Sequence, residues 1–211
     1  MTRHLRIYAL VGIDGSGKTT QAHDLAAWLT GLGVPARYFQ NAGGRRWFGR
    51  LARRLGLRPD AQALLGRSGM LAVEAVLRWL AIGQALVRAR LTGRVAVMDR
   101  YAVCQYASIR AHAGTRLGER VARIAYRLFP TPDVTFLLAV TPQEAYRRID
   151  LRGTDHERLE FLVAAADAYD QLPEASTFIR IDADGPPEEV SHAIRASLVA
   201  NGAVQAPGVP A

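Results

Sequence analysis

The chain has 211 residues, of which 49% are hydrophobic, and its 27 basic and 19 acidic side chains give a formal net charge of +8. That length and apolar content suffice for one α/β domain with a full core. The single cysteine, Cys104, excludes an internal disulfide and disfavours a structural zinc site. No stretch reaches the ~20 apolar residues of a membrane span, and the N-terminus lacks a signal-peptide pattern. We therefore expect a cytoplasmic protein with no membrane association.

The predicted elements alternate along the chain. An apolar run at Leu5–Val11 predicts a buried strand, and a glycine-rich loop leads from it into a helix with apolar periodicity over Gln21–Leu32. Further strands are predicted at Ala36–Gln40, Val95–Met98, Val134–Val140 and Thr177–Ile181. The main helices between them are predicted at Met70–Leu91, Gly118–Leu128, Pro142–Arg152 and Glu157–Leu172. This order predicts a parallel sheet covered by helices on both faces. We expect a single domain over residues 1–200 and a disordered tail over 201–211.

An arginine-rich segment follows the second predicted strand. Between Arg45 and Arg58 the apolar residues recur at spacings of four, so the segment predicts an amphipathic helix with a basic face. That face is either simply solvated or an anion-facing wall for a phosphorylated substrate, to which Arg45 would contribute. Nucleic-acid binding is the least favoured reading, because no platform of stacking aromatic residues accompanies the charge.

The glycine-rich loop at Gly12–Thr19 fits the phosphate-binding pattern G-x-x-x-x-G-K-[ST]. Its Lys18 is the one lysine among the 27 basic residues, and the other 26 are arginines. A compact ammonium bridges two phosphate groups more readily than a planar guanidinium does. The loop amides and the following helix N-terminus would bind the triphosphate of ATP. The expected nucleotide-binding residues are Gly15, Ser16, Gly17, Lys18, Thr19 and Thr20.

Two acidic residues follow predicted strands, at the edge where open parallel sheets bind ligands. Asp14 lies in the loop after the first strand, and Asp99 ends the strand that begins at Val95. A carboxylate at the second position, with the hydroxyl of Thr19, is the usual support of Mg²⁺ in phosphate-loop nucleotidases. We therefore expect ATP and Mg²⁺ as cofactors.

Three motifs together resemble the thymidylate kinase family. They are Gly12–Thr20, Asp99-Arg100-Tyr101, and Phe136–Pro142 with Ala145, Arg148 and Arg152-Gly153 after it. The resemblance extends from about Ile7 to about Leu198. It implies a phosphate-loop nucleoside monophosphate kinase with a five-stranded parallel sheet, which moves the γ-phosphate of ATP to a nucleoside monophosphate. Family members are commonly homodimers through helical faces, and the apolar surface around Val76 and Leu80 fits that expectation.

The resemblance also implies roles for individual residues. Lys18 would contact the β- and γ-phosphates, Asp14 the acceptor sugar, and Arg100 the acceptor phosphate. Arg78 matches an acceptor-binding arginine, although an ion pair with Glu74, four residues earlier, is an alternative. Helices over about 41–92 would form the acceptor side. Because Gly15 stands where some members carry an arginine, the transferred phosphate would be neutralised from a short lid over about 147–158. Arg148 and Arg152 are its candidate catalytic residues.

The departures from the family pattern all fall on the acceptor side. Glu74 stands where family members usually carry a phenylalanine that stacks on thymine, and Gln105 and Ser108 replace residues that line the base pocket. In addition, Asn41–Arg45 replaces the family's Arg-Glu-Pro-Gly-Gly-Thr-like segment after the second strand. A carboxylate cannot stack on a base, so Glu74 would pair with Arg78 or accept from an exocyclic amine, while Gln105 would read an amide edge. We expect the acceptor to differ from dTMP, or dTMP to bind poorly. Alternatives are a kinase of a small alcohol and an ATP-binding regulatory protein.

Overall fold

The computed structural model describes residues 5–41, 61–112, 115–153 and 157–204. For residues 61–72 and 74 the description covers the backbone alone. The arginine-rich segment, with the predicted helix and Arg45, lies outside the described residues. The predicted lid is described only in part, because residues 154–156 also lie outside them.

Five strands form one parallel sheet in the order β2-β3-β1-β4-β5. The strands are β1 (Ile7–Val11), β2 (Ala36–Gln40), β3 (Val95–Asp99), β4 (Val134–Ala139) and β5 (Ile179–Asp182). β1 and β3 are buried along their whole length, which explains why they are continuous apolar runs and not alternating ones. The predicted α/β class and five-stranded parallel sheet are confirmed.

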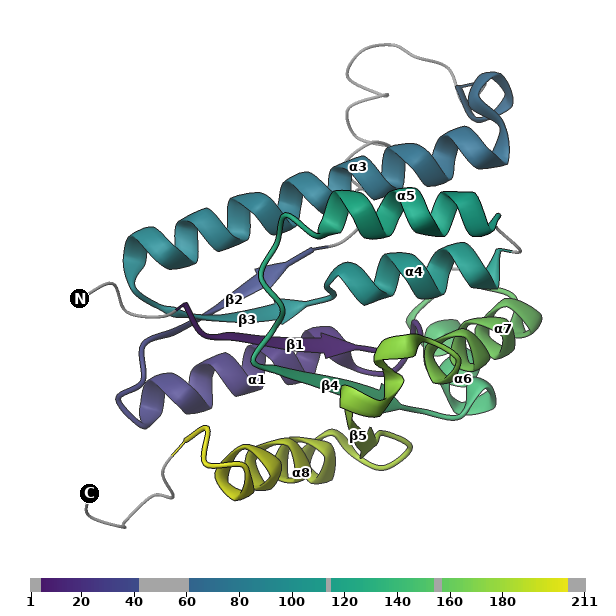
Figure 1. Cartoon of the computed structure of the whole chain (residues 1–211). Coiled ribbons are helices and arrows are strands. Elements are labelled where there is room, and N and C mark those ends of the chain that lie inside the picture. The colour runs from purple at the N-terminus through teal and green to yellow at the C-terminus, as the bar shows by residue number, and fades with distance from the viewer. Residues whose placement is uncertain (1–4, 42–60, 113–114, 154–156, 205–211) are drawn as a thin grey trace.

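Helices cover both faces of this sheet (Figure 1). They are α1 (Lys18–Gly31), α3 (Ala61–Thr92), α4 (Ala102–Ala111), α5 (Arg116–Tyr126), α6 (Pro142–Arg152), α7 (Leu159–Asp170) and α8 (Pro187–Ala200), with a 3₁₀ turn η1 (Pro173–Thr177). In Figure 1, α3, α4 and α5 lie on one side and α1 and α8 on the other, whereas α6 and α7 lie near the end to which the arrow of β1 points. No described helix, the 32-residue α3 included, is apolar enough to cross a membrane.

Several boundaries and elements differ from the predictions, and α3 begins at Ala61, nine residues before the predicted Met70. Helix α1 begins at Lys18 and not at Gln21, because Gly17 in a left-handed conformation turns the loop directly into the helix. The region predicted to start the last strand is the turn η1, so β5 begins two residues late, at Ile179. Helices α4 and α8 were not predicted: α4 buries polar Gln105 among its apolar residues, which hides its periodicity.

The tail prediction also needs correction at its start. Residues 201–204 form a turn in which the carbonyl oxygen of Ala203 accepts hydrogen bonds from Arg6 Nη1 at 3.3 Å and Tyr8 Oη at 3.4 Å. Val204 joins the core cluster of buried residues. Burial of this valine and the contacts to residues around the start of β1 order a segment whose composition alone predicted disorder. Residues 205–211 lie outside the described part of the chain.

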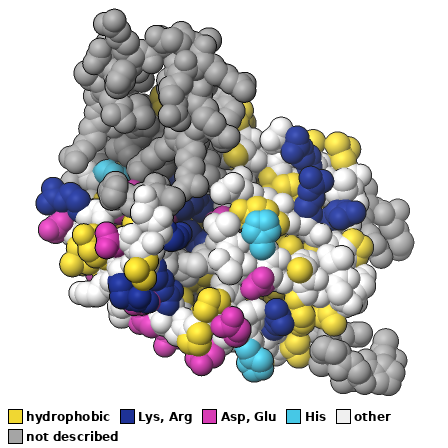
Figure 2. All heavy atoms as spheres, turned by 180° about the vertical axis from the view of Figure 1, so that it is seen from behind, with side chains coloured by type: hydrophobic (Ala, Val, Ile, Leu, Met, Phe, Trp, Pro, Cys, Tyr) yellow, Lys and Arg dark blue, Asp and Glu magenta, His cyan; other side chains and the backbone are white. Residues whose placement is uncertain are grey.

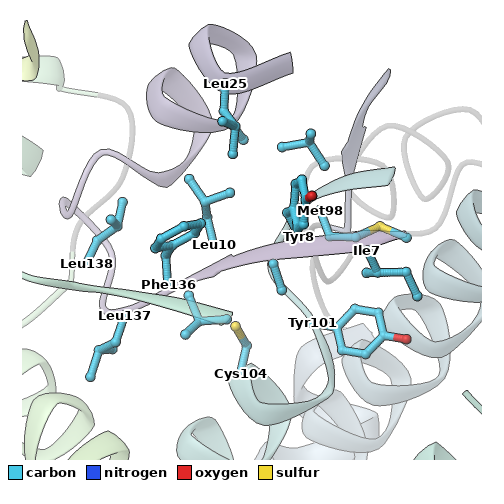
Figure 3. Close-up of a cluster of buried hydrophobic side chains, with 14 of the residues drawn as sticks. Ile7, Tyr8, Leu10, Leu25, Met98, Tyr101, Cys104, Phe136, Leu137 and Leu138 are labelled. Atoms are coloured by element: carbon cyan, nitrogen blue, oxygen red, sulfur yellow. The ribbon is translucent and has the colours of Figure 1, made fainter. Parts of the chain in front are cut away.

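The centre of the core is β1, between its neighbours β3 and β4. Leu10 and Phe136 point toward Leu25 of α1, while Leu137 and Cys104 lie on the opposite side of the sheet (Figure 3). Cys104 is buried and forms no disulfide. This rigid centre holds the phosphate loop, which leaves β1 at Val11.

The positive charge is distributed over the surface. On the face turned away from Figure 1, arginine side chains occur in separate groups, with acidic and apolar side chains between them (Figure 2). Among the described residues, several exposed arginines are paired with carboxylates, for example Arg180 with Asp170 at 2.5 Å and Arg147 with Glu144 at 2.7 Å. The described part of this face is therefore a mixed surface.

Candidate active site

The phosphate loop is fixed by close contact with two other elements. Gly12 and Gly15 have φ angles of 140° and 88°, which glycine adopts readily and other residues rarely do. A Cβ on Gly12 would lie 2.6 Å from the carbonyl oxygen of Leu138, and one on Gly15 would lie 2.5 Å from that of Ala145. The loop therefore fits between β4 and the start of α6 only because both positions lack a side chain.

Lys18 lies inside this loop and is 4% exposed. Its ammonium donates to the carbonyl oxygen of Ile13 at 2.5 Å and to Ser16 Oγ at 3.3 Å, and lies 3.7 Å from Asp14 Oδ1. Burial, together with the nearby guanidinium of Arg100, lowers the pKa of Lys18 to about 8, against the opposing effect of Asp14. The ammonium thus donates hydrogen bonds to oxygen atoms of the loop itself, and phosphate oxygens of a bound nucleotide would replace these acceptors.

Thr19 and Asp99 meet beside the loop, as the sequence predicts. Thr19 Oγ1 donates to Asp99 Oδ2 at 2.6 Å, and Tyr38 Oη donates to the same oxygen at 3.2 Å. Burial and the negative charge of Asp99 raise the pKa of Tyr38, so its hydroxyl remains a donor. Asp99 Oδ1 is buried and has no hydrogen-bond partner in the described part of the chain.

That oxygen and the Thr19 hydroxyl fit a magnesium ion. Mg²⁺ prefers oxygen ligands and is usually held by one or two protein groups together with substrate phosphates and water. The described residues contain no cluster of three or more His, Cys, Asp or Glu side chains that could hold a metal alone. Magnesium bound with the nucleotide at Thr19 and Asp99 agrees with both facts.

On the acceptor side, Arg100 and Asp14 form an ion pair with 2.5 Å between Nη2 and Oδ1. Burial would raise the pKa of Asp14, but Arg100 and Lys18 outweigh that effect and hold it well below the usual range. The same pairing keeps the pKa of Arg100 above its ordinary value despite burial. Both groups are therefore charged at every pH near neutrality. Arg100 also has a φ of 75°, the only positive φ among the described non-glycine residues.

Arg78 of α3 and Gln105 of α4 are two further residues predicted to bind the acceptor. Both are buried, and Arg78 Nη1 donates to Gln105 Oε1 at 2.9 Å. Arg78 is close enough to Asp14 for its charge to help lower the pKa of that carboxyl. The structure thus places Arg78 beside Gln105 and near the Asp14–Arg100 ion pair, and the role of these residues in binding the acceptor stays a prediction. The side chain of Glu74 lies outside the description, so its predicted contact with Arg78 stays a prediction.

The two lid candidates differ in their surroundings. Arg148 Nε donates to Glu144 Oε1 at 2.7 Å, and its Nη atoms donate to the carbonyl oxygens of residues 183–185 at 2.7 to 3.1 Å. Arg152 is exposed near the C-terminal end of α6, with Nε 3.3 Å from the carbonyl oxygen of Arg148. Among the described residues, neither guanidinium forms a hydrogen bond or ion pair with the phosphate loop. Arg148 instead ties α6 to the loop after β5.

Two residues of this site were not predicted. Tyr38 lies in the middle of β2 and Asn41 directly follows that strand, and Asn41 Nδ2 donates to the carbonyl oxygen of Arg100 at 2.8 Å. The rule that ligands gather at the carboxyl ends of parallel strands, applied to Asp14 and Asp99, applies equally to a residue that directly follows β2. Position after a strand was therefore the signal that could have found Asn41.

The fold and the site together define a nucleotide kinase of the phosphate-loop class, since Lys18, the Thr19–Asp99 pair and the guanidinium of Arg100 gather around one loop. Residues 10–194 match the family model for thymidylate kinase. The chain belongs to the thymidylate kinase family. It is similar to a thymidylate kinase of Prochlorococcus marinus (strain MIT 9303), at 30% identity over 92% of the chain and 93% of the relative. It is also similar to one of Halorhodospira halophila, at 31% identity over 94% and 95%.

Membership establishes the reaction. The chain phosphorylates a nucleoside monophosphate with ATP and Mg²⁺, as members of the family do. A probable thymidylate kinase of Archaeoglobus fulgidus, 29% identical over 90% of this chain, belongs to the same group of relatives. The two alternatives, a kinase of a small alcohol and an ATP-binding regulatory protein, find no support in these comparisons.

Proposed function

We propose that the acceptor is a pyrimidine nucleoside monophosphate with a carbonyl group at position 4 of its base, such as dTMP or dUMP. The observation that carries the proposal is the buried contact between Arg78 and Gln105. An arginine only donates hydrogen bonds, so the amide of Gln105 must turn its oxygen toward Arg78 and its Nε2 away from it. A fixed donor at that position favours a base carbonyl over an exocyclic amine.

We also expect dTMP to bind weakly, because of the residue at position 74. Glu74 stands one helical turn before Arg78, where an aromatic ring would stack on thymine. Loss of a stacking ring removes roughly 1–3 kcal/mol of base binding. We therefore expect a KM for dTMP above the micromolar range, and a micromolar value with efficient turnover would contradict this part of the proposal.

The charged groups would act in sequence around the transferred phosphate. Lys18 would exchange the carbonyl oxygen of Ile13 for the β- and γ-phosphates of ATP, and Thr19 and Asp99 would hold the magnesium ion. Bound magnesium supplies charge neutralisation across those phosphates. Arg100, oriented by Asp14, would hold the acceptor phosphate. One oxygen of that phosphate would then attack the γ-phosphorus of ATP, and ADP would leave. The acceptor oxygen is already anionic, so the step requires positioning and charge stabilisation from the protein and no base.

Arg152 is the better candidate for the lid arginine that neutralises the transferred phosphate. Its guanidinium is exposed and has no carboxylate partner among the described residues, whereas Arg148 is held by Glu144 and by three backbone carbonyls. Moving Arg148 into the site would require four hydrogen bonds to break. Moving Arg152 would require the loss of one long contact.

A panel of acceptors tests the base preference. With ATP and Mg²⁺, release of ADP is measured for dTMP, dUMP, dCMP, dAMP and dGMP, and we expect dTMP and dUMP to be preferred. Gln105→Glu keeps an acceptor for Arg78 but removes the Nε2 donor, so kcat/KM for dTMP should fall at least about tenfold relative to dCMP. Gln84→Glu, at an exposed position of α3, is the matched control. A preference for dCMP in the unchanged protein would instead point to Glu74 as the group that reads the base.

We infer in addition that two copies associate through α3 and α5. Both helices expose large apolar side chains at helical spacing, and Trp79 Nε1 joins them through a 3.0 Å hydrogen bond to the carbonyl oxygen of Ala125. The exposed apolar residues are Val76, Leu80, Val87, Leu91, Leu117, Val121, Ile124 and Leu128. Exposed apolar side chains on two neighbouring helices are typical of an interface. We further infer a cytoplasmic location, where ATP and nucleotides are available, and no role for nucleic acid.

Sedimentation tests the association. Ile124→Asp on α5 should convert a dimer into a monomer at micromolar concentration, whereas Leu151→Asp, at a residue of α6 that is equally exposed, should leave the dimer intact. A monomeric unchanged protein, or equal effects of the two substitutions, would contradict the proposed interface.

A further inference from the structure

The backbone of Arg100 adopts a conformation that costs free energy. Its φ of 75° lies in the left-handed region, which a side chain with a Cβ rarely occupies. The residue is nevertheless tied to the sheet, because its amide donates to the carbonyl oxygen of Leu10 at 3.0 Å and extends the pairing of β3 with β1. The chain therefore turns at Arg100 itself, where its guanidinium contacts Asp14. Such a backbone persists only where neighbouring groups hold it.

Asn41, which directly follows β2, holds this backbone through hydrogen bonds. Its side-chain Nδ2 donates to the carbonyl oxygen of Arg100 at 2.8 Å, and its backbone amide donates to the carbonyl oxygen of Asp99 at 3.0 Å. Two successive carbonyl groups of the turn thus receive hydrogen bonds from one residue. Asn41 is fully buried, and Nδ2 also lies 3.3 Å from Met98 Sδ.

The side-chain oxygen of Asn41 indicates that packing alone does not explain an amide at this position. Asn41 Oδ1 is buried and has no hydrogen-bond partner in the described part of the chain. An unsatisfied buried oxygen is unfavourable, and an apolar side chain of the same size would avoid it. We therefore attribute the amide to its nitrogen, which donates a hydrogen bond to the carbonyl oxygen of Arg100.

We propose that Asn41 is a positioning residue for phosphoryl transfer: by fixing the left-handed backbone of Arg100, it directs the Arg100 guanidinium to the acceptor phosphate. The inference rests on the proposed role of Arg100. It assigns a function to a residue in the segment where this chain departs from the thymidylate kinase pattern. Asn41 acts through Arg100 and forms no hydrogen bond with Lys18 or Thr19 in the described part of the chain, so it should affect the acceptor and not ATP.

The test uses Asn41→Leu, which keeps the size of the side chain but removes the donor. With dTMP as the probe, kcat/KM for dTMP should fall about tenfold while KM for ATP changes less than about twofold, because only Arg100 loses its orientation. Asn41→Ala is measured in parallel in case the leucine disturbs folding. Protection of Lys18 from an amine reagent by ATP reports that the donor half is intact in each variant.

Arg100→Gly provides the background that separates positioning from a structural effect. Glycine accepts the positive φ and has no guanidinium to orient, so adding Asn41→Leu to Arg100→Gly should not lower kcat/KM for dTMP further. If Asn41→Leu has no effect on kcat/KM for dTMP, or the same effect in both backgrounds, the role of Asn41 is refuted. If Arg100→Gly itself leaves kcat/KM for dTMP unchanged, the proposed role of Arg100 is refuted instead.

Discussion

The lowered pKa of Lys18 makes a measurable difference to both its reactivity and ATP binding. An ordinary lysine has a pKa near 10.4 and is about 0.4% neutral at pH 8, whereas Lys18, with a pKa of about 8, is half neutral there. Its free amine is therefore about a hundredfold more abundant than that of an exposed lysine at the same pH. Because this chain has one lysine, an amine-selective reagent should modify one internal site.

ATP should bind the protonated form. Phosphate oxygens beside the ammonium raise its pKa, so below pH 8 no proton is taken up at Lys18 on binding, whereas above pH 8 binding must restore the proton. The affinity for ATP should then fall about tenfold between pH 7 and pH 9. Lys18→Arg remains charged over this range and corrects for the titration of ATP itself.

The assay is mass spectrometry of tryptic peptides. Modified Lys18 resists trypsin, so the label should appear in the peptide from Ile7 to Arg37, with a labelling midpoint near pH 8. ATP with Mg²⁺ should suppress the label. A labelling midpoint above pH 10, or equal labelling with and without ATP, would refute the reasoning that places a desolvated ammonium at the triphosphate.

Three further predictions follow from contacts of the loop, the metal site and the lid. Gly15→Ala should lower the melting temperature by about 4 °C or more, because its Cβ would clash with Ala145 and the left-handed backbone would become strained as well. The control Gly33→Ala, with φ of 76° and open space around it, should show only the backbone cost of about 1 kcal/mol, and equal shifts would contradict the close contact with α6. Tyr38→Phe should raise the Mg²⁺ concentration for half-maximal activity about tenfold, because Asp99 loses one of the two donors that orient it, while Tyr8→Phe should not change it. Arg152→Ala should lower kcat at least about a hundredfold with little change in stability, and Arg148→Ala should mainly lower the melting temperature and raise KM for ATP; the reverse assignment would show that Arg148 leaves its carbonyl partners during the reaction.

The sequence predicts the parts of this molecule that depend on local chemistry. β1 and β3 are continuous apolar runs because both faces of the sheet are covered, and that pattern is legible without any knowledge of their neighbours. Lys18, Thr19 and Asp99 are likewise predictable, since the loop motif and the strand end specify their positions. Helix α8 also carries a local signal of a helix start, a proline and two glutamates in its first turn.

Contacts between distant segments could not be predicted in the same way. The fixation of Arg148 depends on three carbonyl groups about 35 residues later, and their position depends on where the loop after β5 passes α6. The contact of Asn41 with Arg100 depends on β2 and β3 being neighbours in the sheet. Neither composition nor periodicity specifies such pairs, because hydrogen bonds between loops follow from the packing of whole elements.

The partners of the cations indicate how each one changes on binding. Lys18 donates its hydrogen bonds to neutral oxygens, the Ile13 carbonyl and the Ser16 hydroxyl. Such bonds each contribute only about 1.5–3 kcal/mol and can be exchanged for bonds to phosphate. Arg100 contacts the carboxylate of Asp14, which a phosphate cannot displace so easily because it carries a full charge in a buried setting. A guanidinium has five donors, however, and the hydrogen bond to Asp14 uses Nη2. Arg100 can therefore keep Asp14 and bind phosphate through its other nitrogens, so the carboxylate orients the acceptor site without competing for it.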